Sequence, residues 1–199
     1  MIQPPGIEAW DAWSPAELAR RLVAVDVAWC VVGGWALDLW HGRVTRGHED
    51  LEIAMPRASF AAIRATLVDH EVFVAGDGAV TYLPPDAPAS REHHQHWVLD
   101  PVARAWRVDL MLEPGDPTTW IYRRDEAIRL PRSETVARTA EGIPYLRPEL
   151  VLLFKAKAQR PKDEQDLAAA LPSLDASARA RLHTLLARVD PGHPWLARV

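Results

Sequence analysis

The sequence predicts an α+β fold in which a mixed-sheet lobe comes first and a small helical lobe follows. Short stretches of alternating apolar and polar residues, typical of strands, recur between residues 27 and 112 with helical patterns among them. After Glu113-Pro114-Gly115 the pattern becomes mainly helical. This change predicts two lobes, residues 1–115 and residues 116–199, packed around a shared cleft.

The first helix begins at a capping box, Ser14-Pro15-Ala16-Glu17, with proline at the first helical position. A short buried strand at 27–32 runs into Gly33-Gly34, and a brief helix at 35–40 ends at Gly42. Residues 51–55 alternate as a strand does, and Pro56 begins a helix that is expected to reach about residue 69.

Four more strands are predicted, at 71–75, 79–83, 97–99 and 106–112. A last short strand at 143–146 precedes the helical lobe. Its helices are predicted at 148–157, 162–171 and 176–189, the last capped by Asp175.

Composition excludes several classes of protein. The formal net charge of −4 argues against a general nucleic-acid coat, so no stable nucleic-acid partner is expected. The single cysteine, Cys30, lies in an apolar run and is expected to be a buried thiol, as in a reducing cytoplasm. Residues 1–11 lack the pattern of a signal peptide, and no apolar run is long enough to cross a membrane. We therefore expect a cytoplasmic protein.

Asp50 and Glu52 form the most informative acidic pair. Residues two apart on a strand project from the same face, with Cα atoms roughly 6.5 Å apart. Neighbouring carboxylates repel each other, and divalent cations between them make the arrangement favourable. A solvent-exposed strand face is the alternative explanation. Gly33-Gly34 favours the metal site, because a phosphate can approach the amides of the helix that opens there.

Asp109 is the only acid in the apolar strand predicted at 106–112. An aspartate in such a strand is costly unless it is paired or faces a site. It is therefore a candidate third carboxylate, and a salt bridge to Arg107 is the alternative.

The three lysines of the chain, Lys155, Lys157 and Lys162, fall close together at the end of one predicted helix and the start of the next. A lysine here could reach a triphosphate across the cleft, and Lys155 is the preferred candidate because it follows an apolar helical face. The alternative is a solvated helix end in which Lys162 pairs with Asp166.

The segments at 33–38 (GGWALD) and 42–53 (GRVTRGHEDLEI) resemble the aminoglycoside and lincosamide nucleotidyltransferases of the polymerase-beta-like superfamily. The resemblance extends to Asp109 and to residues 145–171. It implies that residues 1–115 are a nucleotidyltransferase domain with a mixed sheet and a magnesium–nucleoside triphosphate site, followed by a helical substrate lobe.

The resemblance also implies roles for individual residues. Asp50 and Glu52 would bind Mg2+, with Asp109 as a further metal ligand or a general base. The residues implied to line the nucleotide pocket are Gly33, Gly34, Thr45, Arg46 and His48, and related enzymes use a lysine in the way suggested for Lys155. Glu52 stands where the drug-modifying members carry aspartate.

The implied reaction is magnesium-dependent transfer of a nucleoside monophosphate from a nucleoside triphosphate, expected to be ATP, to a hydroxyl of a small molecule. An aminoglycoside-like antibiotic would fit an acidic pocket, for which Glu113 and Asp116 are candidate walls. The alternatives are a toxin-type nucleotidyltransferase that acts on a protein or tRNA, and a non-catalytic nucleotide-binding module. A monomer or homodimer is expected.

Overall fold

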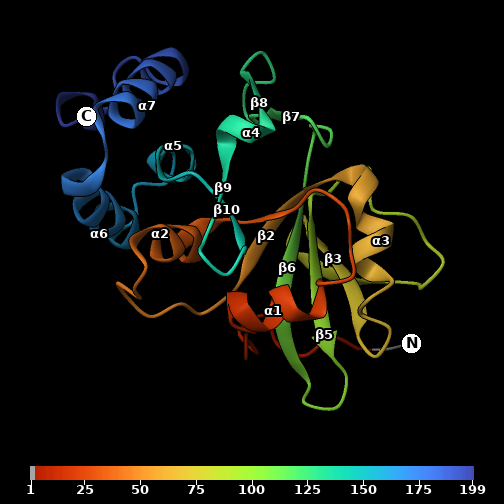
Figure 1. Ribbon diagram of the computed structural model, residues 1–199. Helices are drawn as coiled ribbons and strands as arrows, with labels where there is room; N and C mark the ends of the chain where they lie inside the picture. Colours follow the sequence, from red (N-terminus) through yellow and green to blue (C-terminus); the bar gives the residue numbers. More distant parts are fainter. Residues whose placement is uncertain (1–2) are drawn as a thin grey trace.

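The computed structural model describes residues 3–199, and its centre is an eight-stranded mixed sheet (Figure 1). The strand order is β4-β3-β5-β6-β2-β1-β10-β9. The strands span Cys30–Val31 (β1), Glu52–Pro56 (β2), Glu71–Gly76 (β3), Ala79–Leu83 (β4), Gln95–Asp100 (β5), Ala105–Glu113 (β6), Val136–Arg138 (β9) and Pro144–Leu146 (β10). A separate hairpin pairs β7 (Thr119–Ile121) with β8 (Arg129–Pro131).

The helices lie on both sides of this sheet. They span Pro15–Arg21 (α1), Gly33–His41 (α2), Phe60–Arg64 (α3), Arg132–Thr135 (α4), Pro148–Ala156 (α5), Pro161–Ala170 (α6) and Ala176–Val189 (α7). Figure 1 shows α5, α6 and α7 together at one end of the molecule, with α2 between them and the sheet. The α2 helix contacts both α5 and α6, so it joins the sheet to the helical part.

The predicted α+β class is confirmed, and the largest differences concern short elements. The helix expected from Pro56 to about residue 69 is a 3-10 turn, Arg57–Ser59, followed by the five-residue α3. The predicted strand at 27–32 is reduced to β1. The β9 and β10 strands come from residues after 115 but extend the sheet of the first lobe. The division into lobes 1–115 and 116–199 stays a prediction.

Burial on β2 follows the predicted alternation. Leu51, Ile53 and Met55 are fully buried, whereas Glu52 is only partly covered and faces a cavity. Cys30 on β1 is buried as predicted, and this burial raises the pKa of its thiol, which makes it an unreactive core side chain. In residues 3–199, no helix has the length and apolarity needed to cross a bilayer.

Candidate active site

The start of α2 lies against the strand that carries Glu52. Gly33 has a φ of +65°, and a Cβ atom added there would lie 2.2 Å from Oε2 of Glu52. At Gly34 an added Cβ atom would lie 2.4 Å from Nη2 of Arg46 and 2.6 Å from Cε1 of His48. Both positions therefore need glycine, because functional side chains pack directly on the backbone.

Glu52 and Asp109 are brought together by strand pairing. The β2 and β6 strands are parallel neighbours, and Glu52 is the register partner of Asp109. Asp109 is 2% exposed, and its Oδ2 accepts a hydrogen bond of 2.6 Å from Nε2 of Gln95. Its Oδ1 is buried without a hydrogen-bond partner among the described residues. The alternative salt bridge to Arg107 is not formed, since Arg107 pairs with Asp11 and Asp100.

This pair of carboxylates is electrostatically unfavourable in the protein alone. Burial, and then the charge of Asp50, raise the pKa of Glu52 to about 7. Burial, and then the charge of Glu52, raise the pKa of Asp109 to about 7. Two ionised carboxylates in this position therefore repel each other, and a bound cation would relieve the repulsion.

The donor set suits a magnesium ion that is shared with a substrate. Mg2+ prefers oxygen ligands and usually binds to one or two carboxylates together with substrate phosphates. Glu52, Asp50 and the unpaired Oδ1 of Asp109 offer such oxygens. Across residues 3–199, no three His, Cys, Asp or Glu side chains are close enough to hold a metal by themselves. The residues thus fit an ion whose remaining ligands come from a nucleotide.

A loop held by Asp38 forms one wall of the site. The carboxylate of this buried residue accepts hydrogen bonds from Thr45, through the backbone N at 3.0 Å and the hydroxyl, and contacts Nε2 of His48. The His48 ring stacks on Trp35 at 4.4 Å between centroids. The structure thus places Thr45 as a loop anchor. Sequence reasoning missed Asp38, although a lone acid in an apolar helix was a usable signal.

Ion pairs join this loop to the helical part. Arg46 donates from Nε to Oδ1 of Asp166 at 2.9 Å and from Nη2 to Oδ2 at 3.1 Å. Lys155 is buried, with Nζ 2.7 Å from Oδ2 of Asp166 and 3.2 Å from Oδ1 of Asp163. The alternative pair between Lys162 and Asp166 is not present. Lys155 is therefore fixed by two carboxylates at the edge of the site.

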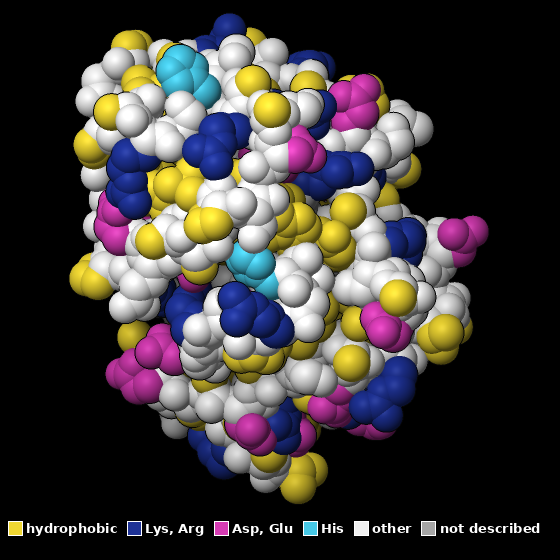
Figure 2. Space-filling view, turned by 60° about the vertical axis from the view of Figure 1, so that its left-hand side comes forward, with side chains coloured by type: hydrophobic (Ala, Val, Ile, Leu, Met, Phe, Trp, Pro, Cys, Tyr) yellow, Lys and Arg dark blue, Asp and Glu magenta, His cyan; other side chains and the backbone are white. Residues whose placement is uncertain are grey.

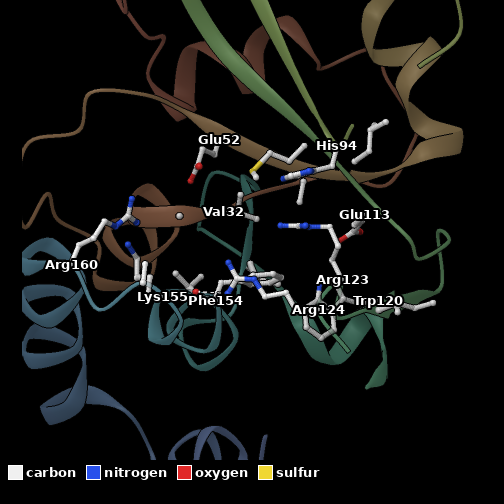
Figure 3. A pocket seen from close by; sticks show the side chains of 18 residues that line it. Val32, Glu52, His94, Glu113, Trp120, Arg123, Arg124, Phe154, Lys155 and Arg160 are labelled. Atoms are coloured by element: carbon white, nitrogen blue, oxygen red, sulfur yellow. Dashed lines mark hydrogen bonds between the residues drawn. The ribbon is translucent and has the colours of Figure 1, made fainter. Parts of the chain in front are cut away.

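Two cavities meet beside Glu52, and we name them by the elements that form them. The α2 cavity has a volume of about 350 Å³, and the hairpin cavity, drawn in Figure 3, has about 290 Å³. Val32, Glu52, Lys155 and Arg160 line both. Of the predicted nucleotide residues, Gly34, Arg46 and His48 line the α2 cavity with Asp50, and Gly33 lines the hairpin cavity. Thr45 and Asp109 line neither.

The sequence of the first lobe matches a known family. Residues 16–97 match the family model of aminoglycoside-2''-adenylyltransferases. The matched segment of this chain contains Gly33-Gly34 and the acidic pair Asp50 and Glu52. This segment of the chain is similar to the aminoglycoside nucleotidyltransferases. The resemblance and the nucleotidyltransferase class of enzyme that it implied are thereby confirmed. Asp109 and Lys155 lie outside the matched segment.

Solved structures support the same fold for this nucleotidyltransferase-like chain. The crystal structure of ANT(2'')-Ia in complex with adenylyl-2''-tobramycin superposes with a TM-score of 0.56 and 17% identity, over 87% of this chain and 95% of that one. A solution structure of ANT(2'')-Ia superposes with a TM-score of 0.53 and 16% sequence identity, over 94% of this chain and 97% of that one. No curated protein matches the chain in sequence.

The hairpin cavity differs from the acidic pocket that the sequence suggested. Glu113 lines the cavity, but its carboxylate is paired with Arg132. Asp116 does not line it, because its carboxylate accepts hydrogen bonds from Thr118 and Thr119 in a surface turn. Of the two suggested acidic walls, only Glu113 lines the cavity, and its charge is neutralised by Arg132. Sequence reasoning missed Arg123, Arg124 and Arg160, which line the cavity instead.

Proposed function

We propose that this chain catalyses magnesium-dependent transfer of a nucleoside monophosphate from a nucleoside triphosphate, with ATP as the expected donor, to a hydroxyl of a small molecule. The observation that carries the proposal is the position of Glu52. Its carboxylate lies against the backbone of Gly33 at the start of α2, beside Asp109 and at the meeting point of the two cavities.

The α2 cavity suits the triphosphate. The positive end of the α2 dipole and free backbone N–H groups favour phosphate at its first turn. Arg160 and Lys162 line the same cavity and add positive charge, and Arg160 is near enough to interact electrostatically with Glu52 and Asp50. The α-phosphate would then lie near Glu52, with the hairpin cavity on its other side for the acceptor.

The chemistry follows from this placement. The acceptor oxygen attacks the α-phosphorus, an oxygen–phosphorus bond forms, and the bond from the α-phosphorus to the bridging oxygen breaks, so that pyrophosphate leaves. Asp50 and Glu52 would hold Mg2+, which supplies charge neutralisation for the phosphates. Asp109, with its unpaired Oδ1, takes up the proton of the attacking hydroxyl.

Binding and transfer are tested separately. Mg2+ with ATP should raise the melting temperature of the wild type, and Asp50→Asn should abolish most of the shift, whereas Asp86→Asn on an exposed loop should keep it. An equal shift in Asp50→Asn would overturn the metal assignment.

Release of pyrophosphate is then measured with each of the four nucleoside triphosphates and a panel of acceptors. Aminoglycosides are the first acceptors to include, because of the family match and the adenylyl-tobramycin bound in the related structure. Nucleotide binding without pyrophosphate release for any acceptor would favour a non-catalytic module.

A further inference from the structure

The hairpin cavity has a positive end that faces away from Glu52. Arg123 and Arg124 come from the connection between β7 and β8, and Figure 3 shows them on the opposite side of the cavity from Glu52 and Arg160. Neither guanidinium has a carboxylate within salt-bridge distance in residues 3–199. Of the other charged groups of the cavity, Glu113 pairs with Arg132, and Lys155 and Arg160 pair with aspartates, while Glu52 lies at the opposite end.

His94 reports the same positive potential. Its side chain lines the cavity, and burial together with the charges of Arg123 and Arg124 lowers its pKa to about 4. His94 is therefore neutral near pH 7, and its ring can donate or accept a hydrogen bond.

Arg124 is held in position for binding. Its Nη1 donates to the carbonyl oxygen of Phe154 at 2.7 Å, and its guanidinium carbon lies 5.2 Å from the Phe154 ring centroid. A guanidinium that is already fixed loses less entropy when it binds an oxyanion, and its planar donors match a carboxylate or phosphate.

The remaining walls are apolar and aromatic. Trp120 is buried, and Phe154 packs 6.3 Å from Trp120 and 4.7 Å from Tyr122, measured between ring centroids. Figure 2 shows several hydrophobic side chains in the middle of the displayed face, interspersed with polar side chains and with Lys and Arg side chains nearby. The cavity volume of about 290 Å³ is at the low end of small-molecule sites, which run from roughly 300 to 1,000 Å³.

We propose that the acceptor at this site is a compact, largely apolar alcohol that carries an oxyanion, bound by Arg123 and Arg124 while its hydroxyl lies near Glu52. This inference rests on the function proposed above and specifies its acceptor. A polycation such as an aminoglycoside would place its ammonium groups beside two uncompensated guanidinium groups, which is unfavourable.

Probes that share one ring and one alcohol isolate the effect of charge. We suggest 4-(hydroxymethyl)benzoate, 4-(hydroxymethyl)phenyl phosphate, 4-(hydroxymethyl)benzylamine and neutral 4-methylbenzyl alcohol, with tobramycin as the polycation. Binding to the full chain is followed by tryptophan fluorescence without nucleotide. We expect both anions to bind at least about tenfold more tightly than the amine and tobramycin. The carboxylate and phosphate arms show which oxyanion is preferred.

Variants test whether Arg123 and Arg124 cause the preference for anionic probes. The double change Arg123→Ala with Arg124→Ala should remove the tenfold preference for the anions, whereas Arg129→Ala, on β8 and outside the cavity, should keep it. Equal or tighter binding of tobramycin by the wild type, or an anion preference that survives in the double variant, would overturn the inference. The melting-temperature shift with Mg2+ and ATP is measured on the same samples, so a failure of nucleotide binding is distinguished from a wrong acceptor class.

Discussion

Glu52 on β2 and Asp109 on β6 are partners in a parallel register, so that two carboxylates stand side by side at the centre of the sheet. Gln95 donates one hydrogen bond to Asp109, and no described residue donates to its other oxygen. Burial raises both pKa values to about 7, with a further contribution from the charge of Asp50 at Glu52 and from the charge of Glu52 at Asp109. A pair that is unfavourable for folding and lies where two cavities meet is typical of a functional site.

Asp109→Asn should separate stability from activity. The raised pKa of Asp109 means that the folded state binds its proton more tightly than the unfolded state, so the cost of ionisation is absent at low pH and complete above about pH 7. In metal-free buffer at pH 8, the variant should gain about 1–3 kcal/mol in free energy of unfolding. Nucleotidyl transfer should fall about 100-fold or more. Urea unfolding and pyrophosphate release measure the two effects.

The control is Asp86→Asn, which changes an exposed aspartate and should alter neither the free energy of unfolding nor the rate of nucleotidyl transfer. A destabilised Asp109→Asn protein with full activity would show that this carboxylate is structural.

The glycines at the two ends of α2 provide a second, matched test. Gly33 and Gly42 have nearly the same φ, +65° and +67°, but an added Cβ atom meets Glu52 at Gly33 and nothing within 4 Å at Gly42. Gly42→Ala should therefore cost only the backbone strain, about 1 kcal/mol, and keep activity. Gly33→Ala should cost more and abolish transfer, because the Glu52 carboxylate must move. Equal losses of stability and activity in both variants would contradict the close contact.

Much of the fold could be predicted because local patterns determine it. The Ser14 cap of α1, the glycine that ends α2 and the Asp175 cap of α7 all lie where the sequence placed them. The helix after Pro56 is shorter than predicted. Its apolar residues are spaced as in a helix up to residue 67, but the α-helix ends at Arg64. The β7–β8 hairpin and β9 have three-residue strands, which are too short for a recognisable alternation.

The site could be predicted only where residues are close in sequence. The Gly33-Gly34 pair and the Asp50–Glu52 pair are local, and the structure places them around the same cavity wall. The link from Arg46 to Asp166 joins residues 120 positions apart, and only the packing of α6 beside α2 creates it. The charge of the hairpin cavity also depends on which acids are already paired, and the sequence does not show that Glu113 is neutralised by Arg132.

Lys155 and Lys157 form a third matched pair of test positions on one helix end. Lys155 is buried between Asp163 and Asp166, whereas Lys157 is exposed. Lys155→Met should lower the free energy of unfolding by about 3 kcal/mol, since it removes one partner from two buried carboxylates. Lys157→Met should change it by less than about 0.5 kcal/mol. Urea titrations at pH 7 measure both, and an unaffected Lys155→Met protein would mean that this network contributes no net stability.

His96 gives the protein a specific sensitivity to acid. The side chain is fully buried, its Nε2 accepts a hydrogen bond of 3.0 Å from the backbone N of Ser90, and its ring packs 4.8 Å from that of Phe60. Burial lowers its pKa to about 4, and the nearby charges of Arg57 and Arg64 act in the same direction. Between about pH 6.5 and pH 4 the unfolded state therefore binds the proton more readily, so stability falls as the pH falls through this window.

His96→Gln tests this because glutamine can keep an acceptor for the Ser90 amide but cannot take up a proton. At pH 7 the variant should be less stable than the wild type by about 1–2 kcal/mol, because it loses ring packing. The difference in free energy of unfolding between the wild type and the variant should narrow by about 1–3 kcal/mol as the pH falls from 7 to 4. In this range only the wild type is destabilised by protonation of residue 96. The control is His183→Gln on the exposed side of α7, for which the difference from wild type should stay constant. A constant difference for His96→Gln as well would mean that His96 accepts its proton without disturbing the fold.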